Sequence, residues 1–113
     1  MSKISIKTTL YYANWCGHCK RFEPEWDKFS EQINDMGNKI GKSEVSIDKI
    51  EDNKISQGSV LINGKEIRGY PTVKISVSDS KGKTVEYEYA GKRDAKSLLN
   101  HFEKEAPNKL NSA

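Results

Sequence analysis

Residues 15–20 read Trp15-Cys16-Gly17-His18-Cys19-Lys20 and contain both cysteines of the chain. Before this stretch, apolar residues alternate with polar ones, which predicts a strand over about residues 3–13. After it, the apolar residues return at spacings of three and four, which predicts an amphipathic helix with Gly37 as its stop signal. That helical face is formed by Phe22, Trp26, Phe29, Ile33 and Met36. The cysteine pair is therefore expected where a strand gives way to a helix.

A thiol at the start of a helix faces unpaired N–H groups and the positive end of the helix dipole, and both favour the thiolate. Cys16 is the outer sulfur and the expected nucleophile, while Cys19 lies one turn inside, placed to attack a mixed disulfide. We expect Gly17 to let the turn close and His18 to stabilise the Cys16 thiolate further. A stabilised reduced form makes the disulfide a better oxidant.

Other uses of the two cysteines fit the sequence less well. A zinc site needs four ligands, and the only further soft ligands are His18, inside the loop, and the distant His101. No metal is therefore expected. Haem attachment needs a histidine directly after the second cysteine, where Lys20 stands. A purely structural disulfide across so short a loop would remove little entropy from the unfolded chain. His101 is interpreted as a surface or half-buried helix residue.

The rest of the chain continues the alternation of elements. A short strand is predicted around residues 45–49, a short helix within 51–58, and a hairpin turn at Asn63-Gly64. Strands over 72–78 and 84–89 follow, joined by a turn at 79–82, and a last helix over 95–106 is ended by Pro107. Pro24 should kink the first helix. This order predicts a parallel strand–helix–strand crossover, an antiparallel pair in the same sheet, and an α/β/α sandwich of three layers.

Length and composition bound the function. The 113 residues predict a single domain over 1–108 and a short tail over 109–113. Hydrophobic residues make up 35% and charged residues 31%, and the net charge of +3 comes from scattered lysines interleaved with acids. We therefore expect neither nucleic-acid nor membrane binding. No signal peptide is visible, which favours the cytoplasm; an excised domain from an oxidising compartment is the alternative.

The stretch from Tyr11 to Lys20 closely resembles the thioredoxin superfamily, and most of all the catalytic domains of protein disulfide isomerases, which carry Cys-Gly-His-Cys. Four further segments match that family in order: Pro24, residues 68–72, residues 89–93 and residues 98–102. The resemblance spans about residues 4–106. It implies a thioredoxin-like α/β/α sandwich, here shortened at the N-terminus and with a central mixed sheet of about four strands.

The resemblance also implies roles for single residues. Pro71 would be cis and face the disulfide, exposing the Tyr70 backbone to an extended substrate segment. The substrate groove would be lined by Trp15, Tyr70, Pro71 and Thr72. Arg93 would swing towards the active site and stabilise the Cys19 thiolate, or else serve as an exposed salt-bridge partner.

The sequence departs from the family at three places. Leu10 stands where the family has a buried acid that relays a proton for the inner cysteine, so we predict slower resolution of mixed disulfides unless another group substitutes. Only fifteen residues precede Cys16, so the family's first strand and helix are not expected and the sheet edge is less protected. The stretch before Pro71 is longer than usual, and a hairpin there is either a surface insertion or an influence on partner choice.

These observations predict a thiol–disulfide oxidoreductase of the protein disulfide isomerase type, acting on protein thiols and disulfides without a dissociable cofactor. Its redox partner would be glutathione or a reductase or oxidase, and we expect a monomer. His18 favours an oxidase or isomerase, whereas the missing signal peptide favours a cytosolic thioredoxin-like reductant. A binding or scaffold module that has lost its redox role is a third hypothesis, motivated by Leu10 and the short N-terminus.

Overall fold

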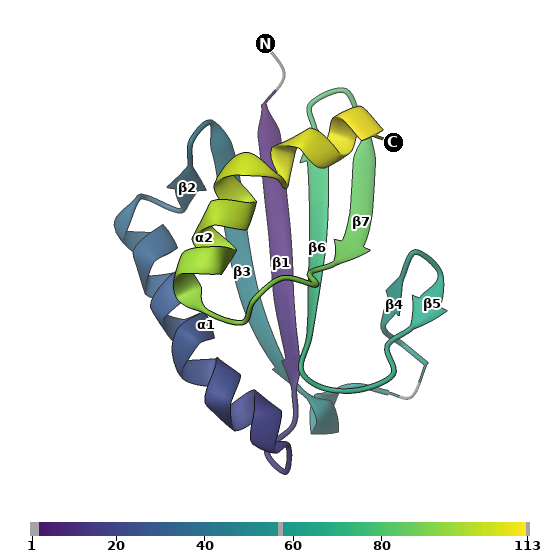
Figure 1. Ribbon diagram of the computed structural model, residues 1–113. Coiled ribbons are helices and arrows are strands. Elements are labelled where there is room, and N and C mark those ends of the chain that lie inside the picture. The colour runs from purple at the N-terminus through teal and green to yellow at the C-terminus, as the bar shows by residue number, and fades with distance from the viewer. Residues whose placement is uncertain (1–2, 57, 113) are drawn as a thin grey trace.

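A computed structural model describes residues 3–56 and 58–112 (Figure 1). The main sheet has five strands in the order β2-β3-β1-β6-β7. These strands are β1 (Ile4–Tyr12), β2 (Lys39–Ile40), β3 (Ser43–Glu51), β6 (Thr72–Asp79) and β7 (Thr84–Glu88). A separate hairpin contains β4 (Leu61–Ile62) and β5 (Lys65–Glu66). The α-helices are α1 (Gly17–Asp35) and α2 (Ala95–Lys104), and the 3-10 helices are η1 (Asp52–Lys54) and η2 (Pro107–Ser112).

The topology confirms the predicted mixed α/β sheet. Strand β1 lies at its centre, parallel to β3 and antiparallel to β6, so that Leu10 sits between Lys49 and Val73. Helix α1 makes the crossover from β1 to β3, and β7 adds an antiparallel edge beside β6. The sheet has one strand more than predicted, because β2 pairs with the start of β3. Two residues are too few to show a period-two pattern, so the sequence carried no signal for β2.

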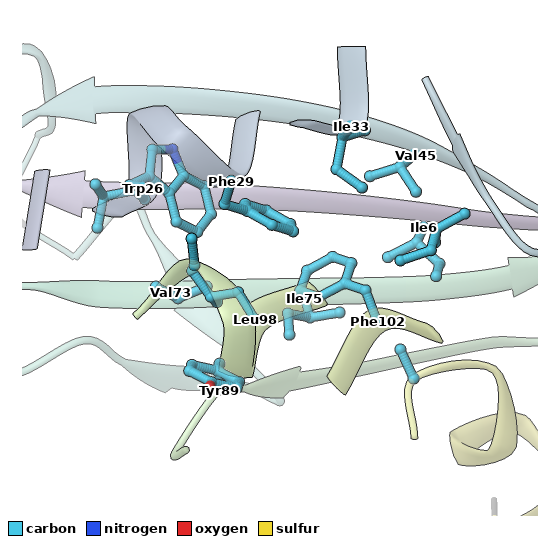
Figure 2. Packing of buried hydrophobic residues seen from close by; sticks show 14 of the residues in the cluster. Ile6, Trp26, Phe29, Ile33, Val45, Val73, Ile75, Tyr89, Leu98 and Phe102 are labelled. Carbon is cyan, nitrogen blue, oxygen red and sulfur yellow. The ribbon is translucent and has the colours of Figure 1, made fainter. Parts of the chain in front are cut away.

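The core lies between one face of the sheet and both α-helices. The predicted helical face of α1 points inward, with Trp26, Phe29 and Ile33 buried. Met36, also predicted on that face, lies beyond the end of α1 and is 47% exposed. Phe102 of α2 meets Phe29 with a ring-centroid distance of 5.0 Å, and Figure 2 shows the side chains of both helices gathered over the strands. In the described ranges, neither α-helix combines the length and apolarity needed to cross a bilayer.

The three-layer prediction is wrong for the second face of the sheet. Both α-helices belong to one core cluster on the same side, and Ser5 and Lys7, which point the other way from β1, are exposed. Among the described residues that face has no α-helix. The β4–β5 hairpin touches it instead, through a hydrogen bond from the Asn63 backbone N–H to Glu86 Oε1 (2.8 Å). The polar alternation in β1 is the local sign of this open face.

Residues 109–113 are not a tail as far as they are described. Helix α2 ends at Lys104, two residues before the predicted end at 106, and η2 then starts at Pro107 and turns the chain back onto the sheet. Leu110 is only 6% exposed and belongs to the main core cluster. One apolar residue after a proline has no periodicity, so sequence reasoning placed the boundary too early.

The connecting segments differ from the prediction in two details. Helix α1 continues through Pro24 as one element. The short helix predicted within 51–58 is only the three-residue η1, and Gln57 lies outside the described residues. The predicted hairpin turn is confirmed: Asn63 and Gly64 have φ of 53° and 79°, the left-handed pair that a tight hairpin requires.

Candidate functional site

The cysteine pair forms the N-terminus of α1. Cys16 is the N-cap residue with extended backbone, and its Sγ accepts a hydrogen bond from the Cys19 backbone N–H at 3.2 Å. Cys16 is 6% exposed and Cys19 is 0% exposed, and both are free thiols. The Cys16 sulfur thus lies at the N-terminal end of a helix with a backbone N–H directed at it. Only Cys16 offers an incoming disulfide any surface.

Cys19 is held in a very different environment from Cys16. Burial, and after it the hydrogen bond with Cys16, raises the pKa of the Cys19 thiol from 9.0 to about 11. At neutral pH this inner thiol is therefore protonated, and it must lose a proton before it can act as a nucleophile.

The chain returns to the cysteines at Tyr70, 54 residues beyond Cys16. The Cys16 Sγ donates to the Tyr70 carbonyl oxygen at 3.5 Å. The Tyr70–Pro71 peptide bond is cis, and Pro71 is buried. Strand β6 starts directly afterwards at Thr72, which is opposite Tyr11 of β1. The β1–β6 pairing thus places the Tyr70 backbone beside the nucleophile.

Trp15 and Thr72, two of the predicted groove residues, differ in their exposure to solvent. Trp15 is 72% exposed; its ring packs edge-on against Tyr70 at a centroid distance of 6.0 Å, and its Nε1 donates to Asp52 Oδ2 at 2.9 Å. Thr72 is buried, and its hydroxyl donates to the Gly69 carbonyl oxygen at 2.7 Å. Thr72 therefore holds the turn before β6 and presents no side chain to a substrate, contrary to its predicted place in the groove lining.

The structure does not bring His18 and Arg93 into contact with the cysteines. His18 is exposed, and Arg21 Nη2 lies 2.8 Å from its Nδ1; because a guanidinium only donates, this nitrogen is the acceptor. Arg93 is exposed, and within the described residues it makes no hydrogen bond or ion pair with either thiol. The swing of Arg93 implied by the resemblance remains a proposal.

Gly17 is not needed for closing the turn, which corrects the sequence interpretation. Its φ lies outside the left-handed region, and a Cβ there would meet Arg21 Nη1 at an ordinary 3.8 Å. The turn that contains Gly17 is the first turn of α1, and the Lys20 N–H closes it by donating to the Cys16 carbonyl oxygen at 3.2 Å.

Sequence reasoning missed Asp52 and Arg21. Asp52 follows the carboxyl end of β3, and β3 is parallel to β1, whose own carboxyl end leads into Trp15. Carboxyl ends of neighbouring parallel strands meet at one edge of a sheet, and this rule could have identified Asp52. Within the described ranges no cluster of histidine, cysteine or acidic side chains could hold a metal ion.

Comparison with known proteins places this geometry in context. The thioredoxin family model matches residues 5–104. A protein disulfide-isomerase of Datisca glomerata is 33% identical over 106 residues, covering 94% of this chain and 19% of the relative. A protein disulfide-isomerase of Arthroderma benhamiae is 35% identical over 112 residues, which cover 99% of this chain and 20% of the relative. The chain thus spans about a fifth of the length of these relatives.

Two solved structures share the fold. The crystal structure of the Trx4 domain of ERdj5 superposes with a TM-score of 0.65 at 25% identity, covering 96% of this chain and 82% of that one. The solution structure of the first thioredoxin domain of mouse protein disulfide-isomerase A4 superposes with a TM-score of 0.57 at 27% identity. The match covers 95% of this chain and 61% of that one. Both confirm the predicted fold class and the resemblance.

Proposed function

The chain belongs to the thioredoxin family, and from this premise we propose that it is a thiol–disulfide oxidoreductase of the protein disulfide isomerase type. One observation carries the proposal. The Cys16 sulfur lies at the start of α1, accepts the Cys19 N–H and sits 3.5 Å from the Tyr70 carbonyl oxygen. A nucleophile, a resolving thiol and an open backbone acceptor are thus collected at one point on the surface.

The proposed exchange runs in two displacements. The Cys16 thiolate attacks one sulfur of a substrate disulfide; a Cys16–substrate disulfide forms, and the other substrate sulfur leaves as a thiolate that takes up a proton. Cys19 then loses its proton and attacks Cys16 Sγ, which breaks the mixed disulfide and releases the second substrate thiol. The substrate is reduced and the Cys16–Cys19 pair oxidised, and the reverse sequence oxidises a dithiol. Both steps use only these thiols, and no cofactor is required.

Position and exposure suggest how a substrate would lie. Trp15 offers a large apolar face beside Cys16, and Tyr70 supplies a backbone carbonyl just before the start of β6. An extended segment with its cysteine at Cys16 could pair with that backbone as an added strand. Proteins with accessible disulfides or dithiols are therefore the proposed substrates, and glutathione or a dedicated oxidase or reductase the proposed redox partner.

The direction of exchange depends on the compartment. The similarity to protein disulfide isomerases favours an oxidising compartment over the cytoplasm, because disulfides persist only where thiols are not kept reduced. We therefore propose net oxidation and isomerisation ahead of reduction.

The first test is the reduction potential of the Cys16–Cys19 pair, measured by equilibration with glutathione. A value near about −180 mV supports an isomerase or oxidase, whereas a value near about −270 mV would indicate a cytosolic thioredoxin-like reductant. Reduction of insulin disulfides, with Cys16→Ser as the control, tests the activity itself. A rate no higher than that of the variant would refute the oxidoreductase and leave a scaffold module.

A further inference from the structure

A cavity of about 320 Å³ adjoins the cysteine site between η1 and the β4–β5 hairpin. Its lining is formed by Asp52, Ile55, Ser56, Gly58, Val60, Glu66, Ile67 and Tyr70. Two of these residues belong to the surroundings of the nucleophile: Tyr70 accepts from Cys16 Sγ, and Asp52 accepts from Trp15 Nε1. The cavity therefore begins where a substrate cysteine would be bound, and the neighbouring residues of that substrate would pass over it.

The charges in this cavity are of one sign. Among the described residues, two charged side chains belong to its lining, and both are acidic: Asp52 and Glu66. The Glu66 carboxylate lies over the chain at Gly58, because a Cβ built there would be 3.0 Å from Glu66 Oε1. The nearby cations Lys65 and Arg68 line the adjacent cavity on the other side of Glu66. Asp52 accepts the Trp15 Nε1 bond through Oδ2, and its Oδ1 has no hydrogen bond or ion pair among the described residues.

The other walls of the cavity are mixed. Ile55, Val60 and Ile67 contribute hydrocarbon to a lining that is otherwise largely polar. A lysine or arginine side chain has the matching construction, since its methylene stem packs on apolar surface while its charged end seeks a carboxylate. An acidic side chain would meet like charge, and a purely apolar one would leave both carboxylates without a partner.

Resting on the proposed function, we propose that this cavity is a specificity pocket for a lysine or arginine that flanks the reactive cysteine of the substrate. The β4–β5 hairpin, which supplies Glu66, is then part of substrate selection. The hairpin's turn is held to the sheet by the Asn63 N–H bond to Glu86, so Glu66 is presented from an anchored element.

The test uses short peptides with a single cysteine disulfide-linked to a chromogenic aryl thiol. The Cys16 thiolate attacks the peptide sulfur and releases the aryl thiolate, whose absorbance gives the rate; Cys19 then frees the peptide thiol. The peptides differ only in the residue flanking the cysteine, on either side in turn, which is lysine, norleucine or glutamate. The readout is the lysine-to-glutamate rate ratio of the full chain, because a general loss of activity or stability cannot change it.

We expect a ratio of about tenfold at low salt, falling at high salt because two partly exposed carboxylates are screened. Glu66→Gln should lower the ratio about threefold, and Asp52→Asn, which keeps an acceptor for Trp15, should lower it similarly. Glu88→Gln is the matched control, since Glu88 lines the adjacent cavity and not this one; its ratio should equal that of the unmodified chain.

The outcomes separate the two proposals. Rapid reaction with every peptide at equal rates would overturn the pocket and leave the oxidoreductase intact. Equal ratios in Glu66→Gln, Asp52→Asn and Glu88→Gln would do the same, because the preference would then come from elsewhere on the surface. Failure to react with any peptide would refute the proposed function, and the pocket with it.

Discussion

At the scale of single residues, Cys16 and Cys19 are three positions apart and yet chemically unequal. Cys16 has some surface and a backbone donor, whereas Cys19 is fully buried and has a raised pKa. Under the proposed function, this inequality makes Cys16 the sulfur that attacks a substrate and Cys19 the sulfur that releases it. It also identifies proton loss from Cys19 as the demanding step.

The resolution step should accelerate with pH. Because burial raises the pKa of Cys19 to about 11, its thiolate fraction grows about tenfold for each pH unit below that value. Single-turnover release of a peptide from its mixed disulfide with Cys16 should therefore rise continuously from about pH 7 to about pH 10. The Cys19→Ser variant should accumulate the mixed disulfide at every pH. A release rate that levels off near pH 8 would show that the inner thiol is not held protonated.

Leu10 offers a test of the missing acid. It is buried beside Lys49, whose Nζ is 3.9 Å from Glu23 Oε2 and 3.5 Å from Asp27 Oδ1. We expect Leu10→Glu to resolve mixed disulfides several-fold faster than Leu10→Gln, since only the carboxylate can accept a proton. Both variants should lose several kcal/mol of unfolding free energy, because each buries a polar group in an apolar site. Equal resolution rates in the two would exclude a relay from this position.

At the scale of elements, α2 is joined to β7 through a half-buried histidine. His101 Nε2 lies 2.6 Å from the Tyr87 hydroxyl, and its Nδ1 lies 2.9 Å from Glu105 Oε2. Burial lowers the pKa of His101, although Glu105 acts in the opposite direction. His101 is thus the half-buried helix residue that the sequence analysis predicted, and the structure adds that it connects α2 to β7.

This connection should make stability sensitive to acid. A histidine whose pKa is lowered by folding takes up its proton more readily in the unfolded chain, so the folded state loses stability as pH falls below about 6.5. His101→Gln keeps a side chain able to bond the Tyr87 hydroxyl and removes the titration. Urea unfolding at about pH 7 and about pH 5 should show a smaller loss in the variant than in the unmodified chain. An identical loss would assign the acid sensitivity to the carboxylates.

At the scale of the whole molecule, one layer of helices covers one face of the sheet, and the C-terminal η2 contributes to that layer. Helix η2 follows α2 across the sheet and returns Leu110 to the core (Figure 1). A domain of this size has a small hydrophobic core, so a buried residue near the C-terminus contributes as much to the free energy of unfolding as one in a helix.

The C-terminal contact can be measured directly. Leu110→Ala should reduce the free energy of unfolding by about 2–3 kcal/mol, the usual cost of deleting a buried leucine side chain, and lower Tm by several degrees. Asn111→Ala, at an exposed neighbouring position, should change it by less than about 0.5 kcal/mol. Equal effects of the two substitutions would mean that η2 is not docked in solution.

The sequence by itself determined the local features: the strand before the cysteines, the helix after them, the hairpin at Asn63-Gly64, and the core face from Phe22 to Ile33. These follow from periodicity and turn chemistry, which act over a few neighbouring residues. The cysteine pair could be predicted as redox-active for the same reason, because a Cys-x-x-Cys spacing at a strand–helix junction is a local pattern.

Only the tertiary structure decided which residues lie around the two cysteines. It brought Tyr70 to Cys16 and Asp52 to Trp15. It left His18 and Arg93 exposed and buried Thr72. It also placed both α-helices on one face of the sheet. These outcomes depend on strand register and on the paths of connections, which join residues far apart in the chain. No local pattern encodes such distances, since they emerge only when the whole core packs.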